Sequence, residues 1–478
     1  MGKALYISTA LPYVNSAPHL GFALEIVQAD VYARYQRLLN KEVFFLTGTD
    51  ENSLKNVQAA REEGISAKEL VSRNTERFFA LKKALNLSFD DFIRTTEDRH
   101  IKGAQKLWQA CQKDIYKKKY QGLYCVGCEG FYKENELIDG LCPEHKTKPE
   151  SIEEENYFFK LTKYSKTIQE LIENDKVRII PESRKNEVLS FIKSGLEDIC
   201  ISRSAERAQG WGIPVPDDPS QIIWVWFDAL SNYINALGYA EEGQKFEKWW
   251  QKNENILHFI GKGILRFHAI YWPAMLISAG LNLPKTIFIH GYLTVGGQKM
   301  SKSLGNVADP FELIKEYGPD AVRYFLLAEF SAVEDGDFTL GKIKNRYNSD
   351  LANGLGNFAA RVLALQSQCP KIGLQKVDKD INEKVQETKQ IAAQKLEAFK
   401  FNEALATIWD LIAFGDKYIN QTEAWKISPS GRSREARQIV FNLRTILDNI
   451  AIMLQPFLPE TSAKISQLKK GEILFPRL

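Results

Sequence analysis

The sequence has few cysteines, almost no net charge and no long apolar run, and each absence excludes a class of protein. Six cysteines among 478 residues are too few for a disulfide scaffold, which indicates a reducing compartment. No stretch reaches the roughly 18 apolar residues that a membrane-spanning helix needs. The first residues, MGKAL, lack the apolar core of a secretory signal. We therefore expect a cytoplasmic protein without a membrane segment.

The charge balance leaves the partner undecided. Lysine and arginine number 63 and aspartate and glutamate 60, so the formal net charge is only +3. Any surface for nucleic acid must therefore come from a local patch. The length predicts about two to four domains.

Strand-like apolar runs and helix-like stretches alternate in residues 1–113 and again in residues 181–300. This alternation predicts a parallel sheet with helices on its faces, which is a Rossmann-like, doubly wound α/β fold. Ligands of such sheets bind at the carboxyl ends of the strands, and both His19 and Asp50 follow strand-like runs. The expected strands are 5–9, 43–46, 222–227, 258–260 and 286–290, and the expected helices are 23–39 and 266–276.

Residues 114–180 interrupt this pattern and read as an insertion with a metal site. Cys125 and Cys128 form a Cys-x2-Cys pair, and Cys142 and His145 form a Cys-x2-His pair after thirteen intervening residues. Thiolates and imidazole at this spacing are typical ligands of tetrahedral zinc. Four protein ligands leave no open position, so we expect one structural zinc in a zinc knuckle.

The last zones differ again. Residues 301–345 comprise a lysine-containing loop and a small connecting region. Beyond residue 346 strand signals fade, and apolar residues such as Leu405, Ile408 and Ile412 recur at intervals of three and four. Residues 346–478 are therefore predicted to form an all-α helix bundle.

Two short motifs point to phosphate chemistry. The run Lys299-Met300-Ser301-Lys302-Ser303 predicts a cationic loop suited to a polyphosphate. Taken alone, such a run is as readily a surface loop. It is accompanied by His19-Leu20-Gly21, which follows a strand-like run and opens a helix-like stretch. The pair resembles the class I aminoacyl-tRNA synthetases.

Further segments narrow the resemblance. Residues 10–15 (ALPYVN), 226–233 (WFDALSNY) and 258–276, with HFIGK and WPAML at their ends, resemble the methionyl-tRNA synthetases. The resemblance covers essentially the whole chain, and the knuckle resembles the one-zinc subtype of that family. An insertion of about 65 residues leaves no room for an editing domain, which the leucyl, isoleucyl and valyl enzymes need because one methylene discriminates weakly.

The resemblance implies an enzyme that activates L-methionine with ATP and Mg²⁺ and transfers it to the 3′ end of tRNA(Met). It implies catalytic roles for His19, Lys299 and Lys302, with Gly21 and Ser301 also at the ATP. Asp50 would bind the substrate ammonium group. An aromatic-walled slot suits a flexible thioether, and the methionine site that the resemblance implies comprises Leu11, Tyr13, Asp50, Trp226, Ala229, Leu230, Tyr233, Ile264, His268 and Trp272.

For the RNA, four residues of the helical zone are candidates. Asn353, Asn357 and Arg361 recur at four-residue intervals and share one helix face, while Trp425 lies farther along. From spacing alone, helix-surface polar groups and a core tryptophan are the better interpretation. The resemblance implies instead that these residues read the anticodon, with tryptophan stacking on an unpaired base.

Two residues depart from the family pattern. Phe22 stands where the family usually has a second histidine, and Gly263 where it commonly has an aspartate that contacts the ATP ribose. These departures keep open a non-catalytic, synthetase-like RNA-binding or regulatory protein. Another class I synthetase without editing, such as the cysteinyl enzyme, is the other alternative. We also expect a monomer, because a C-terminal dimerising domain is not seen.

Overall fold

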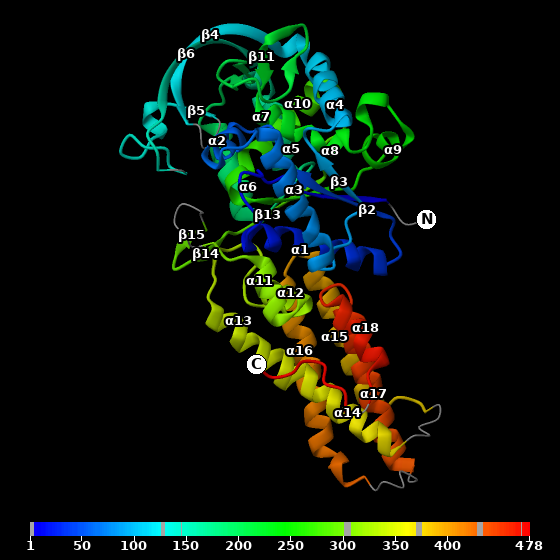
Figure 1. The fold of residues 1–478 in the computed structure, drawn as a ribbon. Coiled ribbons are helices and arrows are strands. Elements are labelled where there is room, and N and C mark those ends of the chain that lie inside the picture. The colour runs from blue at the N-terminus through cyan, green and yellow to red at the C-terminus, as the bar shows by residue number, and fades with distance from the viewer. Residues whose placement is uncertain are drawn as a thin grey trace. The chain divides into compact units, whose positions relative to one another are not determined.

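The computed structural model describes residues 4–125, 130–144, 146–300, 307–369, 375–427, 434–469 and 471–478. The chain divides into two compact units (Figure 1), each built from segments distant in sequence. The sheet unit contains residues 1–18, 40–81 and 89–290. The helical unit contains residues 19–39, 82–88 and 291–478.

Six parallel strands form the core of the sheet unit, in the order β3-β2-β1-β12-β13-β7. From β1 the chain adds β2 and β3 on one side. It then forms β7 at the far edge, β12 beside β1 and β13 between these two, so the strand order reverses between β1 and β12. This confirms the predicted doubly wound sheet. The strands are β1 (Leu5–Thr9), β2 (Val43–Thr49), β3 (Asp91–Arg94), β7 (Arg178–Ile180), β12 (Ile256–Gly261) and β13 (Thr286–His290).

The central strands are mostly apolar and almost entirely buried because helices and loops cover both faces of a parallel sheet. Every residue of β12 is buried, and β1 is buried from Tyr6 onward. In the register between them, Tyr6 lies opposite Ile256 and Thr9 opposite Phe259. The predicted strands 5–9, 43–46, 258–260 and 286–290 are therefore confirmed.

The strand expected at 222–227 is wrong in its second half. The structure has β11 (Asp218–Ile223) followed by helix α7 (Val225–Leu230). β11 belongs to a separate antiparallel sheet with β9 (Ser202–Ser204) and β10 (Pro214–Val215). A short run of apolar residues has no period that distinguishes a strand from a buried helix, and this run contains the end of one and the start of the other.

The insertion contains more strand than its turn-rich sequence indicates. β4 (Ile115–Cys125) and β6 (Glu150–Phe159) run side by side as long curved strands (Figure 1). With β5 (Gly130–Tyr132) and β8 (Ile199–Cys200) they form an antiparallel sheet in the order β5-β4-β6-β8.

The other elements of the sheet unit are mostly helices, which pack around a core rich in large aromatic residues such as Phe227, Tyr233, Trp250 and Trp272. The helix predicted at 266–276 is present, but it begins with a π-helical turn, η7 (Phe267–Tyr271). The α-helices are α2 (Leu54–Glu63), α3 (Ala67–Ala84), α4 (Asp98–Ala110), α5 (Ser165–Glu173), α6 (Glu182–Lys193), α7, α8 (Asn232–Asn235), α9 (Gln244–Phe246) and α10 (Trp272–Ala279).

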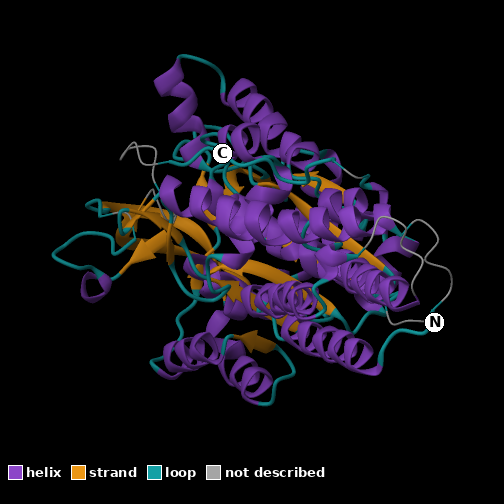
Figure 2. Cartoon of the chain, turned by 90° about the horizontal axis from the view of Figure 1, so that it is seen from below, coloured by secondary structure: helices purple, strands orange, loops and turns teal. Residues whose placement is uncertain are grey.

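Helices predominate in the helical unit, as they do in the chain (Figure 2). The predicted helical region is confirmed: Leu405, Ile408 and Ile412 are buried on one helix, α16. The only extended segments described in this unit are β14 (Leu293–Val295), β15 (Gln298–Lys299) and β16 (Gly336–Asp337). The helices are α1 (Leu20–Leu38), α11 (Pro310–Tyr317), α12 (Pro319–Ala328), α13 (Leu340–Arg346), the π-helical η9 (Tyr347–Gly356), α14 (Asn357–Gln368), α15 (Lys379–Glu397), α16 (Phe401–Gln421), α17 (Arg434–Leu454) and α18 (Pro459–Gln467).

A buried ion pair joins the distant segments of the helical unit. Asp30 of α1 and Arg323 of α12 are both fully buried, with Oδ2 and Nη1 2.8 Å apart. Arg323 also donates to the carbonyl oxygens of Pro456 and Phe457, beyond the end of α17. Loss of one partner would leave a buried charge uncompensated, which typically costs about 3–5 kcal/mol. In the part of the chain that is described, no helix is long and apolar enough to span a bilayer.

Candidate active site

A small cavity lies where the order of the parallel strands reverses. Ala10 and Leu11 directly follow β1, and His268 lies seven residues after the end of β12. Carboxyl ends of strands at such a reversal are the usual ligand site of an open α/β sheet. The cavity is lined by Ala10, Leu11, Trp226, Ala229, Leu230, Asn232, Tyr233 and His268.

The apolar wall of this cavity is closed by an aromatic stack. The rings of Trp226 and Phe267 lie 3.8 Å apart between centroids and are nearly parallel, at 4°. The remaining space is about 10 Å³, roughly the room that one water needs. A thioether side chain therefore enters only if residues of the lining move.

The π-helical turn η7 explains how Phe267, His268 and Trp272 come to surround one site. The backbone N–H of Trp272 donates to the carbonyl oxygen of Phe267, five residues earlier, instead of four. Such a turn is wider than an α-helical turn and is frequent at functional sites. It changes the directions in which these side chains leave the helix.

The polar end of the cavity is a tyrosine–histidine pair. The Tyr233 hydroxyl and His268 Nε2 are 2.7 Å apart, and His268 Nδ1 lies 3.0 Å from the carbonyl oxygen of Ile264. A carbonyl oxygen only accepts, so Nδ1 carries the proton and Nε2 accepts from the tyrosine. Burial lowers the pKa of His268 to about 4. The ring is therefore neutral at physiological pH.

A second neutral histidine supports this pair from within the core. His258 of β12 stacks on the ring of Tyr233 at 4.2 Å between centroids, and its Nδ1 lies 2.6 Å from Ser8 Oγ. Burial, followed by the neighbouring His268, holds the pKa of His258 well below its usual range. Two uncharged rings therefore fix Tyr233, and neither places charge beside the cavity at neutral pH.

Four residues predicted for the methionine site surround this cavity without lining it. Tyr13 forms an isolated parallel bridge with Asp50, and its ring lies 6.4 Å from that of Trp226. Trp272 is fully buried, 6.0 Å from the ring of Tyr233. Ile264 contributes the carbonyl oxygen that orients His268. The other six residues predicted for the methionine site line the cavity together: Leu11, Trp226, Ala229, Leu230, Tyr233 and His268.

Sequence reasoning missed three residues of the site: Ala10, Asn232 and Phe267. Ala10 and Asn232 line the cavity, and Phe267 stacks on its tryptophan wall. Each directly precedes a residue that was predicted for the site. Its position next to that residue was the only feature of the sequence that could have identified it. The π-helical turn that brings Phe267 into place has no recognisable sequence pattern.

His19 lies in the helical unit, at the start of α1. Its Nδ1 accepts a hydrogen bond from the backbone N–H of Gly21 at 3.0 Å, so the proton of a neutral ring is on Nε2. A Cβ atom at position 21 would lie 2.9 Å from His19 Cε1, which explains why glycine follows here. Phe22 is buried. Gly263, the other departure, lies in the short helical turn Lys262–Ile264 of the sheet unit.

Lys299, the first residue of the lysine loop, lies in a three-stranded sheet of β15, β14 and β16 in the helical unit. The backbone of Lys299 pairs with Thr294 across β14 and β15. Asp337 fixes this hairpin because its Oδ1 accepts from Gly297 N at 2.8 Å and from Thr294 Oγ1 at 2.7 Å. Both hydrogen bonds lower the pKa of Asp337, and the one from the backbone of Gly297 has the larger effect. Ser301 and Lys302 lie outside the described residues.

Half of the predicted zinc ligands lie in the described part of the insertion. Cys125, at the end of β4, and Cys142 are both buried thiols. Cys128 and His145 lie outside the described residues. Among the described residues alone, no three His, Cys, Asp or Glu side chains are grouped to bind a metal. The two thiols have the chemistry that zinc prefers.

The predicted anticodon residues lie on α14, on the turn η9 before it and beyond α16. Asn353 and Asn357 are exposed. Arg361 Nη1 lies 2.5 Å from Asp416 Oδ1, and its Nη2 donates to Asn420 Oδ1 at 3.1 Å. Burial raises the pKa of Asp416 although Arg361 opposes this. Trp425 is 56% exposed, which leaves a ring face available for stacking.

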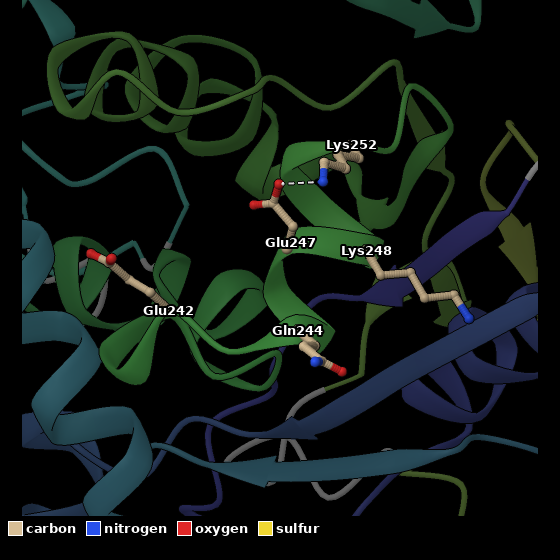
Figure 3. Close-up of a pocket in the computed structure, with 5 residues that line it drawn as sticks. All are labelled: Glu242, Gln244, Glu247, Lys248 and Lys252. Carbon is tan, nitrogen blue, oxygen red and sulfur yellow. Dashed lines mark ion pairs between the residues drawn. The ribbon is translucent and has the colours of Figure 1, made fainter.

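A larger hollow on the sheet unit, of about 440 Å³, has no comparable chemistry (Figure 3). Glu247 and Lys252, neighbours on one helical segment, form an ion pair at 3.0 Å. Lys248 pairs with Glu42, and Glu242 with Lys106 at 2.7 Å. The charged groups therefore neutralise one another and do not converge on a ligand. The hollow is lined by Glu242, Gln244, Glu247, Lys248 and Lys252.

Sequence profiles match both parts of this architecture. One described as "tRNA synthetases class I (M)" matches residues 5–150 and 145–363, and one described as "Anticodon-binding domain of tRNA ligase" matches residues 378–476. The doubly wound sheet, its pocket and the helical region define a class I aminoacyl-tRNA synthetase.

Individual relatives narrow this class. The chain is 41% identical to a methionine–tRNA ligase of Caldanaerobacter subterraneus subsp. tengcongensis, covering 100% of this chain and 79% of that protein. It is 43% identical to one of Brucella suis, covering 96% and 90%. A structure of Mycobacterium tuberculosis methionyl-tRNA synthetase in complex with methionyl-adenylate superimposes with a TM-score of 0.92 at 37% identity, covering 98% and 94%. The chain belongs to the methionyl-tRNA synthetase family.

The buried histidines predict how folding depends on pH. Below about pH 6.5 a histidine of the unfolded chain takes up a proton, whereas folded His268 stays neutral down to about pH 4. The free energy of unfolding should therefore decrease as the pH falls from about 6.5 to 4, by a few kcal/mol from this residue. Urea unfolding at a series of pH values measures this loss.

The variant His268→Gln is the control, because it cannot titrate. Its stability should change less steeply with pH than that of the wild type over this interval. Parallel curves for the two proteins would show that His268 takes up a proton in the folded state.

Proposed function

We propose that the protein is a methionine–tRNA ligase, which activates L-methionine with ATP and transfers it to tRNA(Met). The observation that carries this proposal is an apolar, aromatic cavity with an uncharged Tyr233–His268 end at the reversal of the sheet, in a chain of this family. The expected monomeric state and cytoplasmic location stay predictions.

The cavity suits the side chain of methionine. Aromatic and aliphatic walls favour a flexible, polarizable thioether. The neutral polar end supplies dipoles without charge, so an acidic or basic side chain would be desolvated there without a counter-ion. We assign the substrate ammonium group to Asp50, a residue that is 2% exposed and whose backbone N–H donates to the carbonyl oxygen of Pro12 at 2.9 Å.

Methionine binding then requires the aromatic wall to open. The cavity of about 10 Å³ cannot contain the side chain while Trp226 and Phe267 remain stacked. The π-helical turn that carries Phe267 and His268 is the segment that can adjust, because its hydrogen bonds are less regular than those of an α-helix. Closure around the bound side chain would exclude water from the reacting carboxylate.

Activation needs positioning and charge stabilisation more than covalent chemistry. A carboxylate oxygen of methionine attacks the α-phosphorus, the bond to the bridging oxygen breaks, and pyrophosphate leaves with the electron pair. We assign His19 Nε2–H to a phosphate oxygen. Lys299 and Lys302 would neutralise the leaving pyrophosphate, with Gly21 and Ser301 beside the nucleotide. Mg²⁺, when bound with ATP, supplies further charge neutralisation.

For the insertion we propose one structural zinc bound by Cys125, Cys128, Cys142 and His145. The support is the donor chemistry, with Cys125 and Cys142 both present as buried thiols. Elemental analysis should therefore find about one zinc per chain. The variant Cys142→Ser should lose most of the metal, whereas Cys369→Ser, a buried thiol of the helical unit, should retain it. Metal-free wild type would contradict the proposal.

For the RNA we propose that Asn353, Asn357, Arg361 and Trp425 contact the anticodon. Trp425→Ala should raise the KM for tRNA about tenfold or more, because stacking on one base is typically worth about 1–3 kcal/mol. Ile452→Ala, which truncates another exposed apolar side chain of the helical unit, should charge tRNA normally. Aminoacylation assays on both variants, with thermal unfolding to verify folding, test this. Normal charging by Trp425→Ala would refute the stacking role.

The activation step is tested by ATP–pyrophosphate exchange with a panel of amino acids in the absence of tRNA. We expect exchange with methionine at a rate far above that with leucine, isoleucine or cysteine. The reaction needs the whole site, so it also shows whether Phe22 and Gly263 are tolerated.

Other outcomes distinguish the alternatives. Exchange with cysteine in place of methionine would identify the protein as another class I synthetase without editing. Absence of exchange with every amino acid, in folded protein supplied with zinc, would favour a non-catalytic RNA-binding or regulatory protein.

A further inference from the structure

We propose that Asp228 and His100 are positioning residues for methionine binding. Their side chains connect the loop that carries Asp50 to helix α7, which carries the aromatic wall of the cavity. This inference rests on the proposed function, because it assigns Asp50 to the substrate ammonium group. All the contacts involved lie within the sheet unit.

The connection begins two residues after Asp50. Asn52 Nδ2 donates to Asp228 Oδ2 at 2.7 Å and to the carbonyl oxygen of Thr95 at 3.1 Å. The backbone N–H of the same asparagine donates to Asp50 Oδ1 at 3.3 Å. The position of Asn52 therefore affects the orientation of the Asp50 carboxylate.

On its other oxygen Asp228 binds His100. His100 Nε2 lies 2.5 Å from Asp228 Oδ1, and both side chains are fully buried. Each oxygen of this carboxylate thus has one donor, from the loop after β2 on one side and from α4 on the other. A buried carboxylate that loses a donor cannot recover it from solvent, so both contacts constrain it.

Asp228 is also part of the wall it orients. It lies on α7 between Trp226 and Ala229, which both line the cavity. Its backbone carbonyl accepts from Ser231 Oγ at 2.6 Å. A shift of the Asp228 side chain would therefore move the tryptophan wall relative to Asp50.

His100 is itself held in one orientation. Asn235 Nδ2 lies 3.4 Å from His100 Nδ1 and 3.2 Å from the His100 carbonyl oxygen. An amide N–H that faces Nδ1 leaves the histidine proton on Nε2, directed at Asp228. Helix α4 approaches closely here, since a Cβ atom on Gly103 would lie 2.0 Å from Asn235 Oδ1.

Asp228→Asn is the informative substitution, because it preserves size but replaces one acceptor by an NH₂ group. One of the two donors then faces another donor. We expect the methionine KM in the exchange reaction to rise about tenfold or more, with the KM for ATP within about twofold of the wild type. A general loss of packing would not separate the two substrates.

The exchanged pair Asn52→Asp/Asp228→Asn supplies a rescue. The carboxylate introduced at position 52 would accept from the amide introduced at position 228, whose oxygen would accept from His100. The pairing at position 228 is then restored, whereas the carbonyl oxygen of Thr95 loses its donor. Part of the methionine affinity that Asp228→Asn loses should return. Asn52→Ala, in a partly exposed loop, removes only the loop contact and should also raise the methionine KM.

Asp114→Asn is the matched control. Asp114 is buried and accepts from Lys163, Tyr164 and Ser278, away from the cavity lining. This variant should lose stability with the methionine KM unchanged.

The proposal is overturned if Asp228→Asn and Asn52→Ala both keep the wild-type methionine KM, or if the exchanged pair is as impaired as Asp228→Asn. Wild type that does not exchange with methionine would defeat the proposed function instead. If Asp228→Asn does not fold, the methionine KM values of Asn52→Ala and of the exchanged pair test the proposal.

Discussion

The parallel pairing of β1 with β12 is the constraint on which the candidate site depends. These two strands are 250 residues apart where Tyr6 pairs with Ile256, and the chain leaves them in opposite directions across the sheet. Their carboxyl ends bring Ala10 and Leu11 together with His268. Even the second support of the pocket, the contact of His258 with Ser8, crosses this pair of strands. A shift of register would remove both the wall and its polar end.

The sequence predicted the central strands of the sheet well because they are mostly apolar runs, and it predicted the helical region because the period of three to four persists there. Site residues followed from family motifs: six of the ten residues expected for methionine line the cavity. The physics of composition alone would not have chosen them. A partly buried tryptophan such as Trp226 or a buried histidine such as His268 is usually a core residue, and only the motifs indicated otherwise.

What the sequence could not reveal depends on contacts between distant elements. The run 222–227 divides into strand and helix at Trp224, which lies between the end of β11 and the start of α7, and local pattern does not encode this break. The π-helical turn at Phe267 and the neutral state of His268 arise from packing and burial. The connection from Asn52 through Asp228 to His100 joins three elements, so no segment of sequence contains it.

The geometry of α1 explains how Phe22 can replace a polar residue. Two donors of the first helical turn are already satisfied within the helical unit, since Leu20 N–H binds the carbonyl of Ala308 and Gly21 N–H binds His19 Nδ1. Phe22 is buried on the same helix that buries Asp30 against Arg323, so a histidine there would need a partner inside the unit. The phosphate contact that we propose for this helix would therefore depend on His19 Nε2, with position 22 contributing packing and not charge.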